Sequence, residues 1–195
     1  MRELNTLQEV FEALEYVCQK LNLAFNRDSF HHLTIKDPKR FYLIPFLNNF
    51  IDSSFAVFGN VEDERLNNLE NFYNSDLFQN LSRGVAGTTL YENHPRLSHV
   101  KKHLPEIHST ITKLPCVLIY SAKEQNARFF RLLFHEFIHI LIHDAVQFSD
   151  DKEKEGFVRG IEIKLGLREF NQKDNYCLFY QQIKNEKLLA TLEKI

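Results

Sequence analysis

Apolar residues recur at helical intervals along much of the chain, and this pattern predicts a largely helical protein. The first such stretch runs from about Thr6 to Leu21, and Thr6 and Glu9 have the spacing of a capping box at its start. Residues 62–81 predict a second helix, broken near Asn74-Ser75-Asp76, where polar side chains compete for backbone hydrogen bonds. Further helices are expected over 95–104, 129–142 and 152–167, and at the C-terminus up to about Leu192.

One short stretch has the composition of a strand. Residues 116–120, Cys-Val-Leu-Ile-Tyr, are apolar and rich in β-branched side chains. The pattern leaves open whether this strand lies at a sheet edge, where it could hold an extended peptide, or in the sheet centre. Residues 41–58 are apolar but equally compatible with helix and strand. The stretch 84–87, Gly-Val-Ala-Gly, lacks the Lys and Ser/Thr of a phosphate-binding loop and is interpreted as a turn.

Length and composition fit a single α+β domain. The 195 residues are 44% hydrophobic, enough for one well-buried core, and no repeat or low-complexity segment interrupts them. We therefore expect residues 1–195 to form one domain. Within it, residues 1–105 are interpreted as a mostly helical N-terminal elaboration and residues 106–195 as the core that carries the chemistry.

Charge and cysteine content narrow the class of protein. The net charge is −2, and the nearest approach to a basic run, residues 99–103, is short, so no direct nucleic-acid binding is expected. The three cysteines, Cys18, Cys116 and Cys177, lie far apart without metal-binding spacing. The N-terminus lacks the apolar core of a signal peptide, and no apolar run is long enough for a transmembrane helix. We expect a cytoplasmic protein, or one delivered into a host cytosol as an effector.

The candidate chemistry lies in the apolar stretch 129–142. It contains the pentapeptide His135-Glu136-Phe137-Ile138-His139, an HExxH motif. On a helix the two histidines are one turn apart and can direct their imidazoles at one point, as zinc requires. Buried without partners, each polar group would cost about 1–3 kcal/mol, so a metal explains why they are tolerated. Glu136, about 100° around the helix from His135, suits the role of general base better than that of ligand.

A third ligand is expected from the helix over 152–167. Counting 100° per residue, Glu153 lies on the face that also carries Gly156 and Gly160, whose lack of side chains would let this helix approach the HExxH helix. Glu155 and Glu162 fall on the opposite face beside Arg159, which is interpreted as a solvated face with salt bridges. The predicted zinc ligands are therefore His135, His139 and Glu153, with Glu155 as the runner-up and water in the fourth position.

From residue 116 to about 167 the chain resembles the ImmA/IrrE family of zinc metallopeptidases, which are gluzincin-like HExxH zincins. The similarity comprises the short strand, the polar connector, residues 135–143, His-Glu-Phe-Ile-His-Ile-Leu-Ile-His, and the following Glu-bearing helix. The chain departs from the family in that helix, where the usual Glu-x-x-Ala is represented by residues 153–156, Glu-Lys-Glu-Gly, and the closing Pro is missing. Metzincins fit less well, because the position of their third histidine is Ala145. His143 is interpreted as a supporting or structural residue.

The resemblance implies a mainly helical zincin-like core with a small sheet beside the HExxH helix. It also implies a zinc-dependent endopeptidase for a protein or peptide, with a transcriptional repressor or a host protein as candidate substrates. Two alternatives stay open: a zincin-fold scaffold with a structural metal, and a zinc hydrolase of a non-peptide amide or ester. The candidate donors to the developing oxyanion are Tyr120, Tyr176, Tyr180 and His108.

Overall fold

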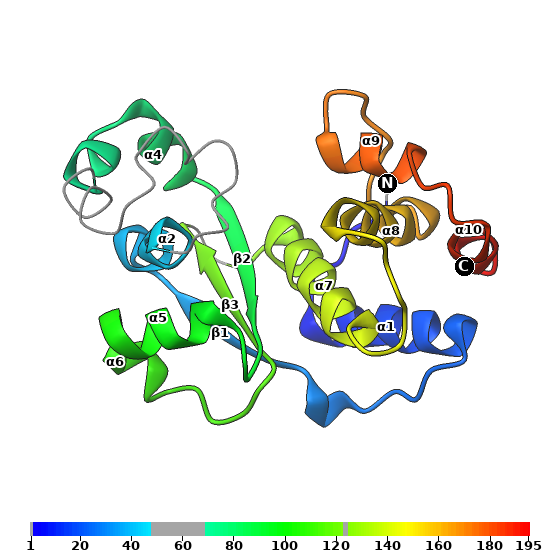
Figure 1. Cartoon of the computed structure of the whole chain (residues 1–195), viewed down its shortest axis with the longest axis horizontal. Coiled ribbons are helices and arrows are strands. Elements are labelled where there is room, and N and C mark those ends of the chain that lie inside the picture. Colours follow the sequence, from blue (N-terminus) through cyan, green and yellow to red (C-terminus); the bar gives the residue numbers. More distant parts are fainter. Residues whose placement is uncertain (1, 48–68, 123–124) are drawn as a thin grey trace. The chain divides into compact units, whose positions relative to one another are not determined.

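The protein is described by a computed structural model that covers residues 2–47, 69–122 and 125–195 (Figure 1). The chain forms two compact units, one of residues 1–28 with 125–195 and one of residues 29–124. We call them the helical unit and the sheet unit. Neither boundary coincides with the expected division at residues 105 and 106.

The helical unit combines both ends of the chain. Its helices are α1 (Leu7–Leu21), α7 (Ala127–Ile142), α8 (Asp151–Lys164), α9 (Asn175–Gln181) and α10 (Glu186–Leu192). The predicted capping box is present, since the Thr6 hydroxyl accepts a hydrogen bond from the Glu9 N–H and the Glu9 carboxylate accepts one from the Thr6 N–H. The ring of Phe11 on α1 stacks on Phe137 of α7 with centroids 6.0 Å apart. The N-terminal helix is therefore part of the core around the HExxH helix.

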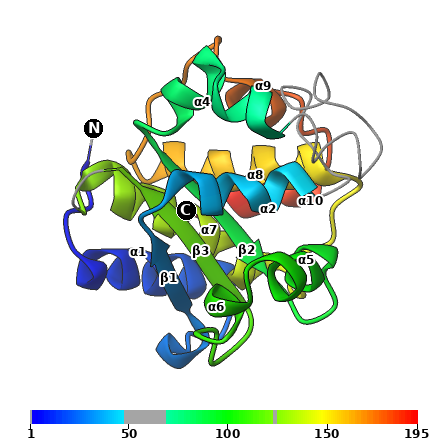
Figure 2. The same cartoon turned by 90° about the vertical axis from the view of Figure 1, so that its left-hand side faces the viewer.

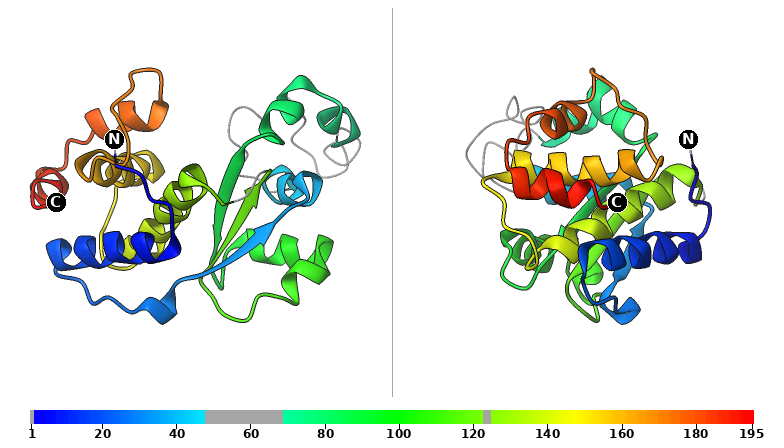
Figure 3. Two further views of the ribbon diagram at one scale, coloured as in Figure 1. Left: turned by 180° about the vertical axis from the view of Figure 1, so that it is seen from behind. Right: turned by 90° about the vertical axis from the view of Figure 1, so that its right-hand side faces the viewer.

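The two helical glycines of α8 lie against α9 and α10, which are visible beside α8 in Figure 3. A Cβ on Gly156 would come within 2.6 Å of the backbone of Phe179, and a Cβ on Gly160 within 2.9 Å of the Tyr180 ring and 3.0 Å of Leu192. The prediction that these glycines allow close approach to the HExxH helix is wrong. Instead, they allow α8 to pack closely on α9 and α10. The sequence of α8 alone could not show which helix its glycines contact.

The sheet unit contains a three-stranded sheet of order β1-β3-β2, shown in Figure 2. Strand β1 (His31–Ile35) pairs parallel with β3 (Cys116–Ser121), and β2 (Val85–Leu90) pairs antiparallel with it. All six residues of β3 are buried. The predicted strand is therefore central, and its backbone is already paired on both sides, so the alternative of an edge strand that holds a substrate is excluded.

The interpretation of residues 84–87 as a turn is wrong, because Val85, Ala86 and Gly87 begin β2. Pairing with β3 supplies backbone partners for this segment, with Gly87 opposite Ile119, and a local pattern cannot anticipate such a long-range partner. The turn lies just before the strand, where the Gly84 N–H donates to the carbonyl of Leu81.

Helices complete the sheet unit: α2 (Pro38–Leu47), α4 (Asp76–Leu81), α5 (Pro95–His103) and α6 (Pro105–His108). The break predicted near residue 75 is confirmed, since Ser75 caps α4 by accepting a hydrogen bond from the Phe78 N–H. Residues 41–47 of the ambiguous apolar stretch are helical, whereas the parts of both predictions that fall on residues 48–68 lie outside the described residues. The predicted fold class, mainly helical α+β with a small sheet, is confirmed. None of the helices in the described ranges combines the length and apolar character needed to span a membrane.

Candidate metal centre

The two histidines of the HExxH motif lie on successive turns of α7, within the helical unit. Asn126 begins this helix by accepting hydrogen bonds from the backbone N–H groups of Arg128 and Phe129. Each histidine is only 7% exposed, and their Nε2 atoms are 3.2 Å apart. The helix therefore directs both imidazoles at one point, as the spacing predicts.

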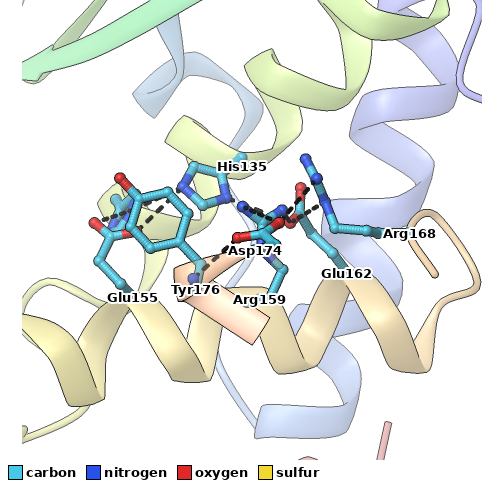
Figure 4. Close-up of polar contacts among 8 residues, drawn as sticks. His135, Glu155, Arg159, Glu162, Arg168, Asp174 and Tyr176 are labelled. Carbon is cyan, nitrogen blue, oxygen red and sulfur yellow. Dashed lines mark hydrogen bonds and ion pairs between the residues drawn. The ribbon is translucent and has the colours of Figure 1, made fainter. Parts of the chain in front are cut away.

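Glu155 of α8 completes the group (Figure 4). Its carboxylate reaches both rings, with Oε2 at 3.4 Å from Nε2 of His135 and Oε1 at 3.2 Å from Nε2 of His139. The Glu155 side chain is 29% exposed, so the group is reached by solvent from the side of this carboxylate. Among the described residues this is the one group of three such side chains whose ligand atoms could share a metal ion.

The separations between these donor atoms fit zinc. Zinc bonds to histidine nitrogen and carboxylate oxygen are about 2.0–2.2 Å long, so neighbouring ligands of a tetrahedral site lie about 3.3–3.6 Å apart. The observed separations of 3.2, 3.4 and 3.2 Å are close to that edge length. Two imidazoles and one carboxylate are also a donor set that zinc accepts, and they leave one position open.

The structure brings the runner-up Glu155, and not Glu153, to the histidines. Glu153 lies in the first turn of α8, where its N–H donates to Asp150 at 2.7 Å and its carboxylate accepts a hydrogen bond from the Ser149 N–H at 2.8 Å. Its carboxylate is thus engaged in capping the helix. The spacing of Asp150 and Glu153 is that of a capping box, and this signal could have assigned Glu153 to the helix start.

The interpretation of the Glu155–Glu162 side of α8 as a solvated face is wrong at its centre. Arg159 is 4% exposed and Glu162 is fully buried, and the two form an ion pair. Arg168 adds a contact at 3.4 Å to Glu162, and both arginines contact Asp174, at 3.7 Å from Arg159 and 3.3 Å from Arg168. The charges are tolerated because they compensate one another in the interior. The sequence pattern alone cannot distinguish charged residues that are buried in pairs from charged residues that are exposed to solvent.

The pKa values of His135, Glu155 and Glu162 depend on one another through their charges. Burial disfavours the charged form of His135, but Glu162 and Glu155 outweigh this effect and raise its pKa from 6.5 to about 10. Burial acts to raise the pKa of Glu155, whereas hydrogen bonds with both histidines lower it far more. The pKa of Glu162 is lowered as well, because His135 and the two arginines outweigh its burial. These shifts favour a protonated His135 between ionised carboxylates when no metal is bound.

The other predicted site residues have distinct positions. Glu136 is buried on α7 beside His135, and His143 ends the helix with an exposed ring 3.9 Å from Asp144. Of the four candidate oxyanion donors, Tyr176 has its ring beside that of His135, with centroids 6.5 Å apart. The remaining three are placed elsewhere: the Tyr120 hydroxyl donates to the Ser82 carbonyl in the sheet unit, the Tyr180 ring lies near Gly160, and His108 ends α6.

No protein-family model, curated protein or solved structure matches this chain. The resemblance to the ImmA/IrrE peptidases therefore stays an expectation from the motifs that carry it. What the site can do is derived below from its own residues.

Proposed function

We propose that this chain is a zinc-dependent peptidase whose metal is held by His135, His139 and Glu155. The observation that carries the proposal is the set of separations among the three donor groups, 3.2 to 3.4 Å, which are close to the edges of a tetrahedron around zinc. Each of the three groups lies within 3.4 Å of the other two, so together they offer a metal ion three donor atoms at one point.

The composition of the site supports a catalytic role over a structural one. Structural zinc is held by four protein ligands, whereas three protein ligands with one open position are typical of hydrolases. Among the described residues, the group contains three donors, and the partly exposed Glu155 marks the side that solvent reaches. Glu136, beside the first ligand in the sequence, has no counterpart in a purely structural site.

Each residue then has a defined task. When bound, zinc would acidify a water molecule and polarise the carbonyl of the substrate. Glu136 accepts the proton of the attacking water and passes it to the departing amine. We assign to Tyr176, whose ring lies beside that of His135, the donation of a hydrogen bond to the oxygen on which negative charge develops. The substrate class, a protein or peptide such as a transcriptional repressor or a host protein, rests on the sequence resemblance.

The test combines metal content with cleavage. Purified wild-type protein is expected to contain one zinc per chain and to cleave members of a quenched random peptide library. His135→Ala and His139→Ala should lose both properties, whereas Glu136→Gln should keep the zinc and lose about 10²- to 10⁴-fold in rate. His143→Ala, at the exposed end of the same helix, is the matched control and should behave as wild type. Full zinc content in the double variant lacking His135 and His139 would refute the proposal.

A further inference from the structure

His135 lies between two carboxylates, as Figure 4 shows. On one side Nε2 faces Glu155 at 3.4 Å, and on the other Nδ1 is 3.6 Å from Oε2 of Glu162. A separation of 3.6 Å is too long for a hydrogen bond, so the second contact is an ion pair. The two ring nitrogens are thus assigned to different partners, and only Nε2 points toward the donor group of the metal site.

Glu162 is held firmly in place. It is fully buried, it is paired with Arg159 from its own helix, and Arg168 lies 3.4 Å from the same oxygen. Asp174 contacts both arginines, so two acidic and two basic groups compensate one another. If one member of such a buried set moved away, it would leave an uncompensated charge in the interior. This cost holds all four groups in position.

Besides the Nε atoms of Arg159 and Arg168, two further buried atoms in this region lack a hydrogen bond among the described residues. They are Nδ1 of His135 and Oε1 of Glu162. An unsatisfied buried donor or acceptor costs about 1–3 kcal/mol, so a state in which Nδ1–H donates to this carboxylate is favoured. Shortening the 3.6 Å separation to hydrogen-bond length requires a shift of about 0.6 Å, within reach of a small side-chain rotation.

We infer that Glu162 is a positioning residue of the metal site, which holds His135 with its proton on Nδ1 so that Nε2 is free to bind the metal. The inference rests on the proposed function, because it takes His135 to be a ligand. A carboxylate that accepts the second N–H of a ligating histidine fixes the orientation of the ring and increases its basicity as a ligand. Arg159, Arg168 and Asp174 act one step further out, by holding the carboxylate of Glu162.

The first measurement is the dissociation constant for zinc, by competition with a chromophoric chelator. Glu162→Gln is expected to weaken binding about 10- to 100-fold, the usual effect of removing such a partner. Glu153→Gln is the matched control, because it neutralises a carboxylate of the same helix that serves the cap, and it should change the constant less than about threefold. A folded Glu162→Gln variant with wild-type affinity would overturn the inference.

The second measurement uses the wild-type protein, so it does not depend on whether a variant folds. Long-range proton–nitrogen NMR spectra of the zinc-loaded protein, labelled with ¹⁵N-histidine, report the state of each ring nitrogen. For His135 we expect a protonated Nδ1 and a metal-bound Nε2, and the reverse assignment would overturn the role of Glu162. If His135→Ala instead binds zinc as tightly as wild type, the proposed function itself fails, so the two failures are distinguishable.

Discussion

The two units bury different kinds of polar group. In the sheet unit the polar residues that are buried as a whole, among the described residues, carry neutral hydroxyls: Thr88, Thr89 and Ser121. In the helical unit they are ionisable: His135, Glu136, His139, Arg159 and Glu162. A buried hydroxyl can be satisfied by a single hydrogen bond, as when Arg96 donates to Thr88 at 2.6 Å, whereas a buried charge needs several compensating groups.

This difference separates the core of the sheet unit from the part of the molecule that carries the candidate metal site. The core of the sheet unit is built on large apolar and aromatic side chains, among them Phe41, Tyr42, Phe72, Phe78 and Tyr120. The helical unit places ionisable groups at positions where apolar residues of similar size would pack at lower cost, and perturbed buried groups of this kind are typical of functional sites.

The largest effect that distinguishes the units is expected from removing one buried charge. Arg159→Met should lower the free energy of unfolding by about 3–5 kcal/mol, because Glu162 loses its closest positive partner in the interior. Thr88→Val in the sheet unit should cost about 1 kcal/mol, because it removes one hydrogen bond from the partly buried Arg96. Urea-induced unfolding of both variants, followed by circular dichroism, measures the two costs. Equal costs would show that the buried charges of the helical unit are not tightly compensated.

The sequence predicts the two histidines of the candidate metal site but not the glutamate that completes it, for a physical reason. His135, Glu136 and His139 lie within five consecutive residues of a single helix, so local geometry alone brings the histidines together. Glu155 and Glu162 come from another helix whose middle turns, residues 156–162, are buried almost throughout. Helical periodicity identifies the buried face of a helix only where the opposite face is exposed to solvent. In α8 exposed residues lie only near the ends, so the periodicity could not show which glutamate faces the histidines.

The choice of third ligand gives the next largest effect. Glu155→Ala should weaken zinc binding by more than about 100-fold, because it removes a carboxylate that reaches both histidines. Glu153→Ala should leave zinc binding within a few-fold of wild type and lower stability by about 1 kcal/mol through the loss of a cap contact. Zinc titration and thermal unfolding of the pair separate the two roles. Strong loss of zinc in Glu153→Ala alone would restore the original prediction.

In the fold, too, the sequence predicted local features but not contacts between distant residues. Local signals predicted α1, the break before α4, α5 and the strand β3, and each is present. They did not predict β2 or the contact of Phe11 with Phe137, because both depend on partners far away in the sequence. Contacts between residues far apart in the sequence are therefore what the sequence alone does not predict, in the sheet as at the candidate metal site.

The smallest effect, about tenfold in zinc affinity for each pH unit, concerns the proton that His135 is expected to carry before a metal binds. His135 has a pKa raised from 6.5 to about 10, with Glu162 as the main cause of the rise, so at pH 7 it is charged before the metal binds. Zinc requires the neutral ring, so its binding should release about one proton at pH 7. The apparent affinity should then rise about tenfold per pH unit until pH approaches 10.

Without zinc, the stability of the protein should change with pH in the opposite direction. Because the pKa of His135 in the folded chain lies above its ordinary value of 6.5, its contribution to stability is fully present below pH 6.5 and is lost as the pH rises to about 10. Over the same interval zinc should stabilise the protein increasingly. Calorimetric titration of zinc in buffers that differ in ionisation enthalpy counts the released protons, and unfolding of the metal-free protein at several pH values gives the second trend. No proton release at pH 7 would mean that His135 is neutral before zinc binds, and that the buried charges of the helical unit do not control its protonation.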